Sequence, residues 1–190
     1  MDAAIGRVVK VLNDEGIADQ TVIIWASDNG GTANNGAGGS NSPLRGQKGS
    51  AYDGGLRVPA FVVWPGVLQP GKVHNGLFTV LDWMPTLAEA VGFETGGAEL
   101  DGVSLWKELL GGSPVERGAV VLGGGVNMAV FRGEFKFVQQ TMGQNTVQAL
   151  YRIFEDPNEE RDVTNQYPEV AAELFAILRA HPRGAADRAM

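Results

Sequence analysis

A glycine-rich stretch from Gly30 to Gly55 constrains this chain more than any other feature. Nine of its 26 residues are glycine, in a 190-residue chain with 27 glycines. Glycine loses the most backbone entropy on folding and offers no side chain for packing. The stretch therefore predicts neither a regular helix nor a central strand. A long loop and a flexible linker both fit this composition, and the flanking sequences decide between them.

Both flanks are strongly structured, which favours a loop within a folded domain. Upstream, apolar residues at helical spacing predict an amphipathic helix that ends at Gly16. Thr21–Ala26 and Val58–Trp64 are continuous apolar runs without polar alternation, which is typical of parallel strands buried on both faces. A further helix is predicted from Met84 to Val91. The order helix, strand, long loop, strand, helix indicates an α/β layer architecture.

The pattern changes after about Gly111 to short strands and one last helix, which begins near Pro168. The strand candidates are Ala119–Leu122, Asn127–Phe131, Phe135–Gln139 and Leu150–Phe154. We expect a small antiparallel sheet covered by the C-terminal helix. The domain prediction is an α/β part over residues 1–112 and a small α+β subdomain over residues 113–190. The acidic turn Glu155–Glu160 is interpreted as a solvated connection.

Composition and charge exclude several classes of protein. The net charge is −7, and a nucleic-acid-binding protein would normally carry a basic face instead. No apolar run reaches the roughly 18 to 20 residues that span a bilayer. The N-terminal residues lack the basic and then apolar pattern of a signal peptide, so no compartment is assigned. The chain has no cysteine, which excludes disulfides, thiolate metal sites and a cysteine-derived nucleophile.

The first candidate site follows the first predicted strand, where Asp28 and Asn29 stand side by side. In open α/β sheets, ligands bind beyond the carboxyl ends of the strands. A carboxylate and an amide oxygen are hard donors that suit Ca²⁺ or Mg²⁺. The alternative is an Asx turn, in which both side chains only bind nearby backbone amides.

The second candidate site is the segment 43–55, which carries Arg45 and Lys48. Small residues around Lys48 leave its amine accessible, so the two cations together could bind a sulfate or phosphate oxygen. The alternative is that both are solvated loop charges, the usual fate of exposed lysine and arginine. Asp53 is interpreted as a hydrogen-bond acceptor that braces the loop.

Together these stretches resemble the C-terminal portion of a type I sulfatase, of the arylsulfatase kind in the alkaline-phosphatase-like superfamily. The matching stretches are Thr21–Gly31 (TVIIWASDNGG), Pro43–Gly66 (PLRGQKGSAYDGGLRVPAFVVWPG), Leu81–Gly92 (LDWMPTLAEAVG), Asp101–Leu105 (DGVSL) and Leu150–Val163 (LYRIFEDPNEERDV). The resemblance implies part of an alkaline-phosphatase-like sheet with flanking helices. It also implies that Asp28 and Asn29 are ligands of a divalent metal, usually Ca²⁺ and less often Mg²⁺. By the same resemblance, Lys48 binds the substrate sulfate.

The family's nucleophile has no matching position in this sequence. It is a formylglycine, made from the first residue of a Cys/Ser-x-Pro-x-Arg motif. The nearest stretch is Asn41–Arg45, where an asparagine occupies the nucleophile position, and we interpret this match as coincidence. The chain is accordingly expected to be the C-terminal part of a longer domain, or one half of a split protein.

The resemblance predicts a sulfuric ester hydrolase that acts on an aryl or carbohydrate sulfate, with this chain inactive alone. Loss of neighbouring strands would expose apolar surface, so we expect self-association or a partner chain that supplies the missing half. A first alternative is a non-catalytic remnant or half-site module that binds an anion or oligomerises. A second alternative keeps the superfamily but changes the reaction to phosphate or phosphonate ester hydrolysis.

Overall fold

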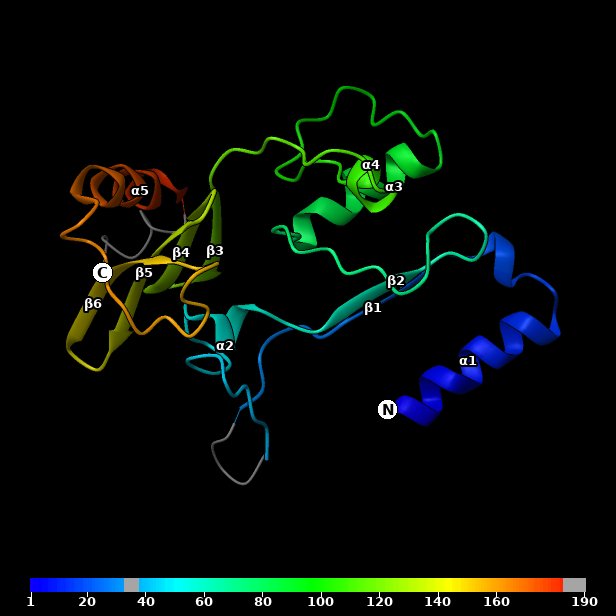
Figure 1. Cartoon of the computed structure of the whole chain (residues 1–190), viewed down its shortest axis with the longest axis horizontal. Helices are drawn as coiled ribbons and strands as arrows, with labels where there is room; N and C mark the ends of the chain where they lie inside the picture. Colours follow the sequence, from blue (N-terminus) through cyan, green and yellow to red (C-terminus); the bar gives the residue numbers. More distant parts are fainter. Residues whose placement is uncertain (33–37, 183–190) are drawn as a thin grey trace. The chain divides into compact units, whose positions relative to one another are not determined.

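The structure, a computed structural model, describes residues 1–32 and 38–182 of the chain (Figure 1). Two compact units are formed. The first contains Met1–Trp25 and Phe61–Arg117, and the second contains Ala26–Ala60 and the residues from Gly118 onward. Each unit is therefore made from segments that are far apart in the sequence. The boundary at residue 112 remains a prediction.

The first unit is mainly helical. Its elements are α1 (Asp2–Asp14), the 3-10 helix η1 (Ala18–Gln20), most of β1 (Ile23–Ala26) and β2 (Ala60–Val63), the 3-10 helix η3 (Val80–Asp82), α3 (Trp83–Ala90) and α4 (Trp106–Leu109). The two predicted helices are confirmed as α1 and α3. Gly16 and Gly92 follow their ends with φ of 68° and 67°, a left-handed conformation that glycine adopts without a steric penalty.

Strands β1 and β2 confirm the two predicted strands, but their predicted burial on both faces is wrong. In the described residues they form a two-stranded sheet. Trp25 stacks on Phe61, with ring centroids 5.6 Å apart. Ile24, Phe61 and Val63 are nevertheless 36%, 41% and 43% exposed. The prediction from the apolar run assumed a larger parallel sheet with covered faces. The burial differs because a two-stranded sheet cannot cover both faces of its own strands.

A buried carboxylate links three segments of the first unit to one another. The Asp82 side chain accepts hydrogen bonds from Thr79 N (2.7 Å) and Val103 N (3.0 Å), and it pairs with Arg117 at 3.0 Å. Burial alone would raise the pKa of Asp82, but Arg117 and the hydrogen bonds outweigh it, and the pKa lies below 3.8. The ionised carboxylate therefore connects η3 to two distant segments.

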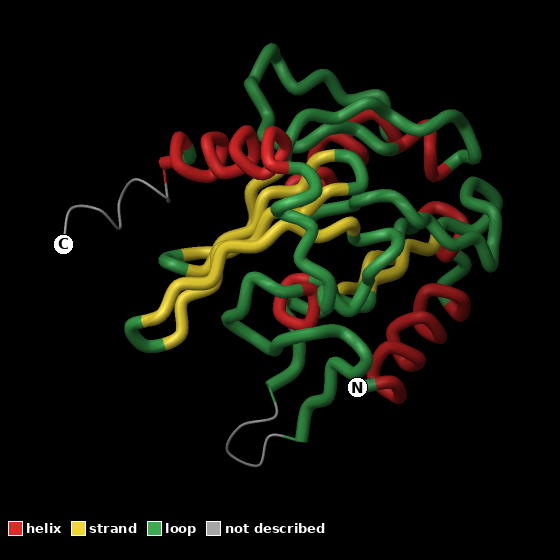
Figure 2. The backbone as a smooth tube through the Cα atoms, turned by 60° about the vertical axis from the view of Figure 1, so that its left-hand side comes forward, coloured by secondary structure: helices red, strands yellow, loops and turns green. Residues whose placement is uncertain are grey.

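The second unit contains the predicted antiparallel sheet. Its elements are α2 (Asp53–Leu56), β3 (Val120–Gly124), β4 (Asn127–Arg132), β5 (Phe135–Met142), β6 (Asn145–Arg152) and α5 (Pro168–Ala180). The strands pair in sequence order, β3-β4-β5-β6, and every pair is antiparallel. Figures 1 and 2 show α5 lying along this sheet. The last strand begins at Asn145, earlier than the predicted Leu150, because a polar hairpin pairs Met142 with Asn145.

The two faces of this sheet have different covers. On one face, Val130, Phe137 and Leu150 pack with Leu174 of α5 in a buried apolar cluster. On the other face, Ala129, Val138 and Ala149 are at most 2% exposed. That face meets the end of the glycine-rich stretch, where Ala51 N donates to Gln140 Oε1 at 2.7 Å. The predicted small sheet with a covering helix is confirmed, and the loop forms its second cover.

The helices of the described chain are short. The longest, α1 and α5, have 13 residues each, and no described helix combines the length and apolar content that crossing a bilayer requires.

Candidate functional site

Asp28 and Asn29 lie directly beyond the carboxyl end of β1, in the second unit. The Asp28 side chain is exposed, and Asn29 is partly buried. Ser27 holds the backbone here: its N donates to Pro59 O (3.2 Å), and its Oγ donates to Asn29 O (3.1 Å). Within residues 1–32 and 38–182, neither the Asp28 nor the Asn29 side chain makes a hydrogen bond. Two neighbouring residues with oxygen-bearing side chains therefore follow the end of β1.

The two side chains offer the oxygen donors that a hard divalent cation prefers, but they are too few to complete its ligand shell. Ca²⁺ takes about six to eight oxygen ligands, and two side chains supply only part of that shell. Within residues 1–32 and 38–182, no group of three or more His, Cys, Asp or Glu side chains is placed to hold a metal. Further ligands would have to come from water, substrate or other residues.

Glycines pack backbone against backbone beside this pair. Gly30 N donates to Gly55 O at 3.0 Å. An ideal Cβ on Gly30 would lie 1.8 Å from Gly54 O, and one on Gly54 would lie 2.4 Å from Gly46 O. Contacts this short exclude any side chain at Gly30 or Gly54. The described part of the glycine-rich stretch, residues 30–32 and 38–55, is thus a loop in close contact with its surroundings, with a short helix, α2, at its end.

Lys48 is tied to the same region through its backbone. Its N–H donates to Gly31 O at 3.1 Å, two residues after Asn29. The side chain of Asn41 bridges the two segments, because its Oδ1 accepts from Gly31 N (2.7 Å) and its Nδ2 donates to Gly31 O (2.8 Å). The Lys48 side chain is exposed. The backbone therefore brings Lys48 to the segment that carries Asp28 and Asn29.

Arg45 is exposed, as the solvated-charge alternative expects, but its guanidinium also contacts neighbouring residues. Its Nη1 donates to Glu159 O (2.8 Å) and to the Tyr151 hydroxyl (3.2 Å), and its guanidinium lies 4.0 Å from the Tyr52 ring centroid. Nη1 and one face of the guanidinium are thus held by contacts inside the second unit. Asp53, by contrast, is confirmed as a bracing residue, because its carboxylate pairs with Lys136.

Two important residues escaped the sequence analysis, Lys136 and Glu159. The Lys136 Nζ lies 2.5 Å from Asp53 Oδ1 and 2.7 Å from Glu159 Oε1. Lys136 and Glu159 are both fully buried, and Asp156 is 8% exposed, so the interpretation of residues 155–160 as a solvated connection is wrong at Asp156 and Glu159. Burial raises the pKa of Glu159, although Lys136 opposes the shift. A lysine within an apolar strand (FKFV) was the available signal.

Comparisons with known proteins agree with the resemblance. The family model Sulfatase matches residues 1–93. Arylsulfatase A of Bos taurus is 32% identical over 206 aligned residues, which cover 94% of this chain and 40% of that protein. The crystal structure of Ps i-CgsB superposes with a TM-score of 0.81 at 26% identity, covering 94% of this chain and 40% of that one.

A further solved relative is named for a different activity. The phosphonate monoester hydrolase of Agrobacterium radiobacter matches with a TM-score of 0.67 at 25% identity, over 94% of this chain and 39% of that one. The chain thus spans about two fifths of the length of each of these three relatives. Its mixed α/β fold, with an antiparallel sheet and a C-terminal helix, is that of a portion of an alkaline-phosphatase-like sulfatase. In sequence and in fold, the chain matches the sulfatase family.

Proposed function

We propose that this chain is the metal-holding and sulfate-binding part of a sulfuric ester hydrolase. One observation carries the proposal. Lys48 N bonds to Gly31 O at 3.1 Å, which ties the lysine's segment to the segment of Asp28 and Asn29. A cation-binding pair and an anion-binding lysine on one braced loop system suit an ester whose sulfate group contacts both a metal and an ammonium.

Each of the three residues has a distinct role in this proposal. The Asp28 carboxylate and the Asn29 amide oxygen would hold Ca²⁺, with Mg²⁺ as the weaker fit. Bound Ca²⁺ would polarise the sulfate oxygens as a Lewis acid. Lys48 would bind a sulfate oxygen through its ammonium, which acts as a compact charge on a flexible stem. The close packing around Gly30 keeps the backbone that carries these groups fixed.

The covalent step needs a nucleophile that the sequence of this chain does not supply. It has no cysteine, and Asn41 stands at the nucleophile position of its nearest matching motif. The Asn41 side chain is instead bound to both polar backbone atoms of Gly31. We therefore propose a half-site that is inactive alone and self-associates or needs a nucleophile-bearing partner chain. The exposed Ile24, Phe61 and Val63 support such association.

A phosphonate or phosphate ester is the second candidate substrate class. The similarity to the phosphonate monoester hydrolase of Agrobacterium radiobacter favours it. A metal and a lysine bind a phosphoryl oxygen by the same electrostatics that bind a sulfate oxygen. The stretch PLRGQKGSAYDGG, on which the arylsulfatase resemblance depends, favours the sulfate ester.

Hydrolysis of a chromogenic aryl sulfate, aryl phosphate and aryl phosphonate tests this proposal. With Ca²⁺ present, we expect the chain alone to show no turnover above that of Asp28→Ala and Lys48→Ala. Adding a nucleophile-bearing N-terminal portion of a related sulfatase should produce sulfate ester turnover that both variants lose. Turnover by the chain alone, lost in both variants, would contradict the half-site. Preferential turnover of the phosphonate would favour the second candidate.

A further inference from the structure

The segment around Lys48 is fastened at several points to the antiparallel sheet of the second unit. Gly49 O, next to Lys48, accepts from the Asn127 side chain on β4 (3.0 Å). Ala51 N donates to Gln140 Oε1 on β5 (2.7 Å). Glycine-rich backbone has few side chains to pack, so hydrogen bonds and ion pairs of this kind must set its position. The sheet therefore acts as the support of the proposed sulfate-binding loop.

The strongest fastening is a buried ionic group, the Lys136 cluster, which consists of Lys136, Asp53 and Glu159. The Lys136 Nζ joins Asp53 Oδ1 at 2.5 Å and Glu159 Oε1 at 2.7 Å. The ammonium also lies 5.0 Å from the Phe131 ring centroid. The side chains of Lys136 and Glu159 are 0% exposed, and that of Asp53 is 9% exposed. Water cannot replace either partner of the ammonium at such a site.

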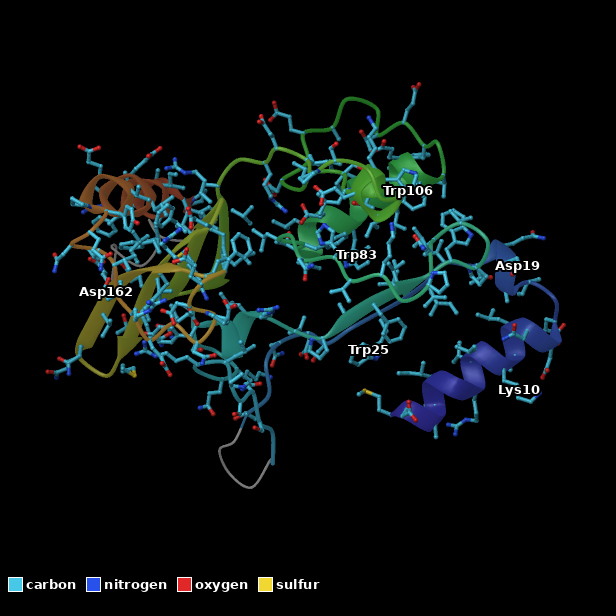
Figure 3. The ribbon with its side chains drawn as sticks, viewed as in Figure 1. Lys10, Asp19, Trp25, Trp83, Trp106 and Asp162 are labelled. Atoms are coloured by element: carbon cyan, nitrogen blue, oxygen red, sulfur yellow. The ribbon has the colours of Figure 1, made fainter. Side chains whose placement is uncertain are left out.

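Glu159 connects the cluster to both ends of the loop. Its Oε2 accepts from Asp53 N at 2.7 Å, and its backbone O accepts from Arg45 Nη1 at 2.8 Å. The segment that carries Glu159 is itself held by Asp162, labelled in Figure 3, whose Oδ1 accepts from Leu150 N of β6 at 3.2 Å. Lys48 lies between Arg45 and Asp53 in the sequence. The loop is thus fixed on both sides of Lys48 by one buried glutamate.

We propose that the Lys136 cluster positions Lys48 for sulfate binding without touching the sulfate. This inference rests on the proposed function for the identity of the ligand. The ammonium pulls Asp53 onto β5, and Glu159 completes the fixed geometry of the segment. With the cluster intact, the Lys48 N–H stays bound to Gly31 O, and the lysine is held beside the segment of Asp28 and Asn29. Without it, the loop retains its sequence but loses its support.

Asp53→Asn tests the proposal with little change in volume. It removes one buried charge and leaves the Lys136–Glu159 ion pair in place. The matched control is Asp14→Asn, which makes the same change in the exposed pair of Asp14 with Lys10 at 2.6 Å (Lys10 is labelled in Figure 3). Hydrogen exchange of the Lys48 amide should become about tenfold faster in Asp53→Asn, while the amides of α5 keep their protection. The affinity for inorganic sulfate with Ca²⁺ should fall about tenfold.

Lys136→Met is the second variant, since it removes the ammonium and keeps an apolar stem. Unchanged exchange at Lys48 in Asp53→Asn would overturn the proposal, and so would unchanged exchange in a folded Lys136→Met. If Lys136→Met unfolds, the Asp53→Asn result decides alone. Lys48→Ala separates the claim that Lys48 binds sulfate from the claim that the Lys136 cluster fixes its segment. If this variant leaves the sulfate affinity unchanged, the proposed function fails. The hydrogen exchange of the Lys48 amide in Asp53→Asn then still tests whether the cluster fixes the segment.

Discussion

Gly30→Ala is expected to destabilise the second unit by about 3 kcal/mol, near the upper end for inserting a methyl group into a packed site. The added Cβ would lie 1.8 Å from Gly54 O and 2.8 Å from Gly54 C. Both atoms belong to the backbone, so no flexible side chain can move aside. The loop must therefore separate from the segment after β1, and the Gly30 N to Gly55 O bond would break. Urea unfolding followed by circular dichroism measures the change.

Gly118→Ala is the control for this prediction. Gly118 has no heavy atom within 4 Å of an added Cβ, and it belongs to the same unit. It should change the free energy of unfolding by less than about 1 kcal/mol. A Gly30→Ala chain as stable as the Gly118→Ala chain would contradict the close packing around Gly30.

Lys136→Met is expected to lower the free energy of unfolding at neutral pH by about 3–5 kcal/mol. The substitution keeps the apolar stem and removes the cation, so Asp53 and Glu159 become buried carboxylates without a partner. Their mutual repulsion and burial both oppose ionisation. Chemical unfolding at pH 7 measures this loss.

The pH dependence distinguishes this cause from simple loss of packing. Burial already raises the pKa of Glu159 above 4.5, and removal of Lys136 raises it further. A carboxyl with a raised pKa in the folded state favours folding below its unfolded value, and this contribution is lost as the pH rises through the folded value. The deficit of Lys136→Met should therefore shrink as the pH falls toward 4.5. Adding Asp53→Asn and Glu159→Gln should recover much of the stability at pH 7. A deficit that is independent of pH would contradict the ionic explanation.

Local patterns in the sequence predicted most elements of the fold. The apolar stripe before Gly16 and the run Thr21–Ala26 correspond to α1 and β1, because helix and strand periodicity are local properties. Burial was less predictable. The same run indicated a strand covered on both faces, but Ile24 is partly exposed because cover depends on other strands and not on the strand itself.

Some residues of the candidate site could likewise be predicted from the sequence, and others could not. The sequence places Asp28 and Asn29 after a predicted strand, and the family resemblance marks both as metal ligands. The sequence also predicts that the Lys48 amine is accessible. The Lys136 cluster could not be predicted, since Lys136 and Asp53 are 83 positions apart and Asp53 and Glu159 are 106 apart. Arg45 is a similar case, since its partner Glu159 is 114 positions away. A single sequence does not reveal such long-range pairs.

Titration of inorganic sulfate, with and without Ca²⁺, tests most directly whether Asp28, Asn29 and Lys48 form one site. Isothermal titration calorimetry would compare the chain with Asp28→Ala, Lys48→Ala and the exposed control Lys10→Ala. The account predicts that Ca²⁺ strengthens sulfate binding, that Asp28→Ala removes this strengthening, and that Lys48→Ala weakens sulfate binding about tenfold, which corresponds to about 1.4 kcal/mol. Sulfate affinity that is the same in all four proteins, whether or not Ca²⁺ is present, would contradict it.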